Sequence, residues 1–124
     1  MTRVLVVDDN ASNRKLARDV LNAAGFRTLE AATGTEGIEL AVEHEPDVIL
    51  LDLRLPDLPG AEVVRQLNED GRTARIPVVA MSAMSLREHG DWLDTAGFAG
   101  SLDKPIHVRT FPDQVRRFCA RAGG

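Results

Sequence analysis

Short apolar runs divide the chain at fairly regular intervals. Three of them, Val4 to Val7, Val48 to Leu51 and Val78 to Met81, are unbroken and rich in valine, which is typical of strands buried on both faces of a sheet. Two mixed runs, Thr28 to Ala31 and Phe98 to Leu102, indicate weaker strands. The pattern therefore predicts five strands.

The segments between and after these runs carry apolar residues three to four positions apart, which marks one face of a helix. The predicted faces contain Leu16, Val20 and Leu21; Ile38, Ala41 and Val42; Val63, Val64 and Leu67; Trp92, Leu93 and Ala96; and Val115, Phe118 and Cys119. Gly25, Gly97 and Pro46 stand where three of these helices should end, and Thr33 to Glu36 has the pattern of a capping box. Strand and helix thus alternate along the whole chain.

Two strands separated by a helix run parallel, and right-handed crossovers place the helices on both faces of the sheet. The prediction is an α/β fold, a three-layer, doubly wound (βα)5 parallel sheet of the flavodoxin-like type. The unbroken runs belong at its centre and the mixed runs at its edges, which fits the strand order 2-1-3-4-5. In such a sheet the working site lies beyond the carboxyl ends of the strands.

The composition narrows the class of protein further. The chain has 124 residues, 44% of them hydrophobic, and its 15 basic and 19 acidic residues give a formal net charge of −4. We expect residues 1–124 to form one domain, with no output domain. Cys119 is the only cysteine, so a reducing, cytoplasmic location is expected. An acidic chain is a poor match for nucleic acid, and no apolar run reaches the ~18 residues of a membrane span.

Charged and hydroxyl side chains stand where the predicted strands end. Asp8 and Asp9 follow the first strand, Asp52 closes the third, Ser82 closes the fourth and Lys104 follows the fifth. Carboxylates about 4 Å apart repel by roughly 4 kcal/mol at an effective dielectric of 20, so a cluster of three needs a cation. Oxygen ligands of this kind suit Mg²⁺. Taken alone, the Asp8-Asp9 pair would fit equally well as a cap of the following helix.

Together these positions resemble the receiver domain of two-component response regulators, the CheY-like family. The motifs are Val4-Leu5-Val6-Val7-Asp8-Asp9-Asn10; Asp52-Leu53-Arg54-Leu55-Pro56-Asp57 followed by Gly60; Ser82-Ala83; and Lys104-Pro105. Asn10 with Asn13, Ile76-Pro77 and Lys104-Pro105-Ile106 further resemble stand-alone DivK-type regulators and the receiver modules of hybrid kinases. The resemblance covers essentially the whole chain.

The resemblance implies a magnesium-dependent phosphoacceptor. Asp52 would take a phosphoryl group from a phosphohistidine on a partner, either a sensor histidine kinase or a phosphotransfer protein. Asp9, Asp52 and the backbone carbonyl of Arg54 would hold Mg²⁺, and Asp8 would assist. Such a domain is not a conventional enzyme, although it catalyses its own aspartyl phosphorylation and dephosphorylation, and it signals through contacts with a downstream protein.

The remaining positions of the family pattern are partly unusual. Lys104 would pair with a phosphoryl oxygen, and Ser82, in place of the commoner Thr, would donate its hydroxyl to another. Ser101 stands where the family usually has an aromatic ring that swings inward on phosphorylation, so a smaller displacement of that face is expected. Arg54 and Met84 flank the path of the hydrolytic water and should tune the lifetime of the phosphoryl group.

Other functions remain as alternatives. A phosphatase of the haloacid dehalogenase type would need a second Asp two residues after Asp52, where this chain has Arg54. A flavodoxin-like mononucleotide carrier would need a phosphate-binding loop after the first strand, where Asp8 and Asp9 would repel a phosphate. Within the receiver class, the alternative is a segment excised from a hybrid kinase or a larger regulator.

Overall fold

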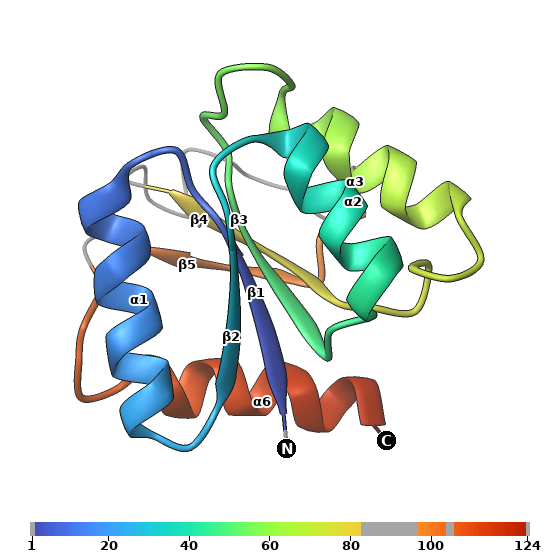
Figure 1. The fold of residues 1–124 in the computed structure, drawn as a ribbon. Helices are drawn as coiled ribbons and strands as arrows, with labels where there is room; N and C mark the ends of the chain where they lie inside the picture. The colour runs from blue at the N-terminus through green and yellow to red at the C-terminus, as the bar shows by residue number, and fades with distance from the viewer. Residues whose placement is uncertain (1, 83–96, 104–105, 124) are drawn as a thin grey trace.

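A parallel sheet forms the middle layer of the molecule (Figure 1). The structure is a computed structural model that describes residues 2–82, 97–103 and 106–123. Within these residues five parallel strands pair in the order β2-β1-β3-β4-β5. They are β1 (Arg3–Val7), β2 (Arg27–Ala31), β3 (Val48–Asp52), β4 (Val78–Ser82) and β5 (Gly100–Asp103). The predicted fold class and strand order are confirmed.

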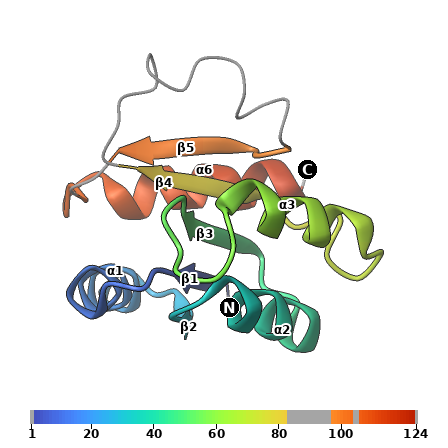
Figure 2. The same ribbon diagram turned by 90° about the horizontal axis from the view of Figure 1, so that it is seen from above.

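Helices cover both faces of the sheet, with α1 and α6 on one side and α2 and α3 on the other (Figure 2). Their bounds are α1 (Ala11–Ala23), α2 (Gly34–His44), α3 (Gly60–Glu69) and α6 (Phe111–Gly123). The helix predicted through Trp92, Leu93 and Ala96 lies outside the described residues. Among the helices that are described, none has the length and apolar content needed to cross a bilayer.

The central strands are unbroken apolar runs because both of their faces are covered. Alternate residues of β1 point to opposite sides: Leu5 and Val7 pack with α2 and α3, whereas Val4 and Val6 pack with α1 and α6. All residues of β3 are buried. The outer strand β2 has only Ala31 buried, which explains its mixed sequence.

The helix boundaries follow the capping chemistry. The Thr33 hydroxyl accepts a hydrogen bond from the Glu36 backbone N–H at 3.1 Å, as the capping box predicts. The reciprocal bond is shifted by one residue, because the Glu36 carboxylate accepts from the backbone N–H of Ala32. At the other end of α2, Glu45 adopts a left-handed φ of 46° before Pro46, so a non-glycine residue ends this helix.

One predicted core position is wrong. Leu16 was expected on the buried face of α1, but its side chain is 39% exposed. Ala17 and Leu21, one turn apart, form the buried centre of that face instead. Successive residues are about 100° apart around the helix axis. Leu16 therefore lies about 100° from Ala17, at the margin of the buried face. This leaves an apolar side chain on the surface of α1.

Gly37 allows α2 to approach β1 closely. A Cβ at this position would lie 2.8 Å from Val7 Cγ2, and Val7 is a buried, β-branched residue with little freedom to move. We therefore expect Gly37→Ala to lower the free energy of unfolding by about 1–3 kcal/mol, as overpacking of a core does. In a helix without this contact, alanine would instead stabilise by roughly 1 kcal/mol.

Urea unfolding followed by circular dichroism would measure this effect. Gly71→Ala is the control, because no atom lies within 4 Å of a Cβ built at Gly71. A Gly37→Ala variant as stable as the unmodified protein would contradict the proposed close packing of α2 on β1.

Candidate functional site

Three carboxylates meet at the carboxyl edge of the sheet. The parallel register pairs Val7 of β1 with Leu51 of β3, so the residues that follow them, Asp8 and Asp52, come next to each other. Asp9 follows immediately in the chain. One carboxylate oxygen from each of the three aspartates lies within 4.8 Å of the others. The structure thus brings together the acidic residues that the sequence singled out.

Backbone N–H groups orient the two buried carboxylates. Asp8 is 3% exposed and Asp52 is 7% exposed, whereas Asp9 is exposed. Asp8 Oδ1 accepts from the Asn10 backbone N–H at 2.9 Å, and Asp52 Oδ1 accepts from the Arg54 backbone N–H at 3.0 Å. Each carboxylate is therefore bonded to the backbone two residues further on, where the chain leaves the strand.

The carboxylate cluster fits a small divalent cation. At about 4.8 Å, each pair of negative charges repels by roughly 3–4 kcal/mol at an effective dielectric of 20. Carboxylate oxygens are the ligands that Mg²⁺ prefers, and a shared cation would convert this repulsion into attraction. Asp8, Asp9 and Asp52 could therefore hold such an ion together.

The competing interpretation of Asp8 and Asp9 as a helix cap is wrong. The residue that caps α1 is Asn10, whose side-chain oxygen accepts from the Asn13 backbone N–H at 3.0 Å. Asp8 and Asp9 therefore do not cap α1, and their carboxylates lie at the edge of the sheet in the cluster with Asp52.

The other predicted site residues can be located through the backbone register. Asp52 pairs with Met81, so Ser82 ends β4 one step beyond it, and Ser82 in turn pairs with Asp103 at the end of β5. The Ser82 side chain is not among the described parts of the structure, and Lys104, Pro105 and Met84 lie outside the described residues.

Ser101 lies inside β5, opposite Ala80 of β4. Ser101 as a whole is half-buried. Its hydroxyl oxygen is fully buried and has no hydrogen-bond partner within the described segments. A seryl side chain fills far less space than an aromatic ring would at this position. The neighbouring Gly100 packs against Phe118 of α6, since a Cβ there would lie 2.6 Å from that ring.

Asp57, to which the sequence analysis assigned no role, contributes to the structure around the site. Its carboxylate accepts three hydrogen bonds from the start of α2: from the backbone N–H of Gly34 at 2.8 Å, the backbone N–H of Thr35 at 3.0 Å and the Thr35 hydroxyl at 2.7 Å. It thereby ties the loop after β3, which contains Arg54, to a helix N-terminus that favours negative charge. These partners are 22 and 23 residues away, so no local pattern reveals them.

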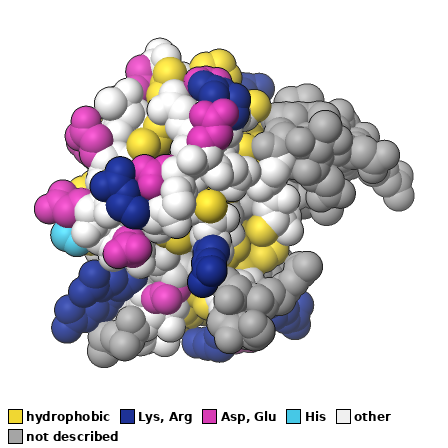
Figure 3. Space-filling view, turned by 90° about the vertical axis from the view of Figure 1, so that its right-hand side faces the viewer, with side chains coloured by type: hydrophobic (Ala, Val, Ile, Leu, Met, Phe, Trp, Pro, Cys, Tyr) yellow, Lys and Arg dark blue, Asp and Glu magenta, His cyan; other side chains and the backbone are white. Residues whose placement is uncertain are grey.

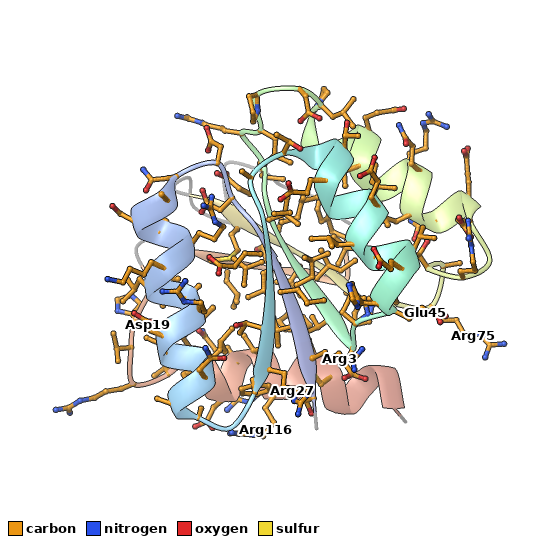
Figure 4. All side chains as sticks on the ribbon, viewed as in Figure 1. Arg3, Asp19, Arg27, Glu45, Arg75 and Arg116 are labelled. Carbon is orange, nitrogen blue, oxygen red and sulfur yellow. The ribbon has the colours of Figure 1, made fainter. Side chains whose placement is uncertain are left out.

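Charge is distributed unevenly over the molecule. Arg3, Arg27 and Arg116 lie at the amino-terminal end of the sheet, opposite to the edge where the strands end (Figure 4). Arg116 lies 5.3 Å from the ring centroid of Phe26. On the side of the molecule that carries α2 and α3, acidic and basic side chains are interspersed (Figure 3). The cluster of Asp8, Asp9 and Asp52 therefore lies at the end of the sheet opposite to these arginines.

Comparison with known proteins agrees with this site. The response regulator receiver domain family matches residues 4–116. The chain belongs to this family and is a receiver domain with a phosphoacceptor signalling role in two-component systems. Among curated proteins it is similar to the polar-differentiation response regulator DivK of Brucella ovis, with 35% identity over 119 residues that cover 96% of this chain and 97% of DivK.

Solved structures give the same result. The chemotaxis response regulator CheY4 of Vibrio cholerae is 28% identical, with a TM-score of 0.89 over 95% of this chain and 98% of that one. The signal receiver domain of a LuxO repressor protein from Vibrio parahaemolyticus is 26% identical, with a TM-score of 0.87 over 98% and 92% of the two chains. The resemblance to receiver domains is thus confirmed, and the phosphatase and mononucleotide-carrier alternatives are not favoured.

The three bonds to Asp57 predict a specific pH dependence. The Thr35 hydroxyl, followed by the backbone N–H groups of Thr35 and Gly34, lowers the pKa of Asp57 from 3.8 to about 2. The unfolded chain therefore takes up a proton here before the folded chain does, and the stabilisation by Asp57 is complete above pH 4 and lost as the pH falls towards 2. Asp57→Asn should be less stable than the unmodified protein at neutral pH, and the difference should shrink over this window.

Urea unfolding at a series of pH values would check this prediction. Thr35→Ala removes one of the three donors, so the pKa of Asp57 should be lowered less. The pH range over which stability is lost should therefore become narrower without disappearing. A stability difference between the unmodified protein and Asp57→Asn that stays constant from pH 5 to pH 2 would show that the bonds to α2 do not lower the pKa of this carboxyl.

Proposed function

We propose that Asp52 is the phosphoacceptor of this receiver domain. An Asp52 carboxylate oxygen attacks the phosphorus of a phosphohistidine on a partner protein, so that a P–O bond forms, the P–N bond breaks and its electron pair returns to the imidazole. The observation that carries the proposal is the position of Asp52, at the end of the buried central strand with its oxygen within 4.8 Å of two further carboxylates.

The same proposal assigns Mg²⁺ to the acidic cluster. Asp9, Asp52 and the backbone carbonyl of Arg54 would hold the ion, with Asp8 assisting. When bound, the ion offsets the charge of the entering phosphoryl group. The bond from the Arg54 N–H to Asp52 Oδ1 supports this assignment, because it fixes the carboxylate and the start of the Arg54 loop relative to each other.

The register supports roles for the neighbouring strand ends. Ser82 ends the strand next to Asp52, and Lys104 follows directly on the strand after that. The Ser82 hydroxyl and the Lys104 ammonium would each contact a phosphoryl oxygen. Arg54 and Met84 would control access of the hydrolytic water, and Ser101 would give a switch without an inward-moving ring.

The partner would dock beside α1. Leu16 on α1 is 39% exposed and Val108, in the segment before α6, is 56% exposed. Val108 also lines a shallow groove of about 410 Å³ with mainly apolar walls, among them Val20 of α1 and Pro112 of α6. α1 begins two residues after Asp9, so a protein on this surface could bring a phosphohistidine to Asp52. The proposal includes a cytoplasmic location, which the unpaired Cys119 supports.

The acceptor assignment predicts a phosphoryl adduct that depends on Asp52 and Mg²⁺. Incubation with a small phosphoryl donor should add one phosphoryl group to the unmodified protein, detected by intact mass, and none to Asp52→Asn. Asp47→Asn, which changes an exposed acid just before β3 at the opposite end of the sheet, should retain the adduct. A phosphoryl adduct on Asp52→Asn would overturn the assignment.

The docking assignment separates protein donors from small donors. Leu16→Glu and Val108→Asp should each slow transfer from a cognate kinase by about tenfold, because truncating or charging an interface anchor costs at least about 1.4 kcal/mol. Phosphorylation by a small donor should proceed at the unmodified rate. The kinase is found by screening the histidine kinases of the source organism for transfer.

Ala74→Asp is the matched control, since Ala74 is exposed and precedes β4 at the amino end of the sheet. If Leu16→Glu and Val108→Asp slowed phosphorylation by the small donor as much as transfer from the kinase, they would damage the site rather than the docking surface.

A further inference from the structure

Arg14 connects the edge of the sheet to the loop that carries the acidic pair. Its Nη1 donates to the backbone carbonyl of Asp8 at 2.8 Å, and its Nε donates to Glu30 Oε1 at 3.3 Å. The Arg14 side chain is only 21% exposed and that of Glu30 is 30% exposed. Glu30 belongs to β2, which lies beside α1 (Figure 1). The guanidinium is thus held between a strand and the loop.

Both polar groups of the Asp8 backbone are engaged by other elements. Its N–H donates to the Ala31 carbonyl of β2 at 3.0 Å, and its carbonyl accepts from Arg14. That carbonyl belongs to the planar peptide between Asp8 and Asp9. Fixing its direction therefore sets the direction in which the chain enters Asp9 and the point from which the Asp9 side chain departs.

We propose that Arg14 is a positioning residue for the metal site, acting through the Asp8 carbonyl rather than through its charge. The inference rests on the proposed function, because it takes Asp9 as a ligand of Mg²⁺. Groups that orient the ligands of a metal without touching it commonly decide its affinity. Here the oriented group is a peptide plane, and Glu30 holds the guanidinium that orients it.

The sign of the effect distinguishes positioning from electrostatics. Arg14 is a cation close to an acidic site, so removal of its charge alone would strengthen the binding of Mg²⁺. Removal of its bond to the Asp8 carbonyl would weaken binding, because Asp9 would lose its fixed starting point. The two effects predict opposite changes in the same dissociation constant.

Arg18 is a matched control within the same network. Its Nη1 donates to the other Glu30 oxygen, Oε2, at 3.1 Å, and its Nε pairs with Asp19. Arg14 and Arg18 therefore share the same acid on the same helix, but the bond to the Asp8 carbonyl comes from Arg14. Arg18→Gln removes an equal charge and an equal partner of Glu30.

The test is calorimetric titration of Mg²⁺ into the unphosphorylated protein and its variants. Urea unfolding compares the stability of these proteins. Arg14→Gln should weaken Mg²⁺ binding about tenfold, as loss of a ligand-orienting group does. Arg14→Lys, which keeps the charge but has a single donor nitrogen, should recover part of the affinity, and Arg18→Gln should bind as the unmodified protein does or slightly tighter. In the metal-free state, amide hydrogen exchange should accelerate at Asp8, whose N–H donates to the Ala31 carbonyl, in Arg14→Gln and not in Arg18→Gln.

Equal or tighter binding by Arg14→Gln would overturn the inference, as would equal weakening by Arg14→Gln and Arg18→Gln. If Arg14→Gln does not fold, Arg14→Lys decides: its single ammonium cannot serve Glu30 and the Asp8 carbonyl as a guanidinium does, so unchanged affinity would overturn the inference. Absence of Mg²⁺ binding to the unmodified protein, or binding unaffected by Asp9→Asn, would overturn the proposed function itself and the inference with it.

Discussion

The parallel pairing of β1 with β3 is the constraint on which the site depends. Val7 and Leu51 are register partners in the buried centre of the sheet. The residues that follow them, Asp8 and Asp52, must therefore lie side by side. A register slip would move every apolar side chain of the strand to the wrong face. The core on both sides of the sheet therefore enforces the approach of two negative charges that would otherwise separate.

Contacts between distant elements then hold the loops beyond the strands. Arg14 and Glu30 hold the loop after β1, whereas Asp57 holds the loop after β3 against the start of α2. The loop after β1 is thus anchored to α1 and β2, and the loop after β3 to α2. Carboxylates whose backbone is fixed in advance lose little conformational freedom when they bind a ligand, so this anchoring would favour the proposed binding of a single ion by the cluster.

The sequence predicted more of the fold than of the interactions that support the site. The strand order and the approach of the three aspartates were confirmed, because buried parallel strands have continuous apolar runs and their carboxyl ends share one edge. The last strand was predicted from Phe98 but begins at Gly100. The predicted burial of Leu16 was wrong. Helical periodicity does not decide which of two adjacent apolar residues, the large Leu16 or the small Ala17, lies at the centre of the buried face. The role of Asp57 was missed because aspartate in a loop before a helix has many uses, and its partners are far away in the chain.

By itself, the sequence determined which segments are strands and helices and which chemical groups stand at the strand ends. These properties depend on neighbours a few residues apart, where backbone geometry and apolar periodicity act directly. Only the tertiary structure decided that Asp57 bonds to α2 and that Arg14 holds the Asp8 carbonyl. Several partners could satisfy each of these polar groups locally, and the packing of whole helices against the sheet selects the one that lies within hydrogen-bond distance.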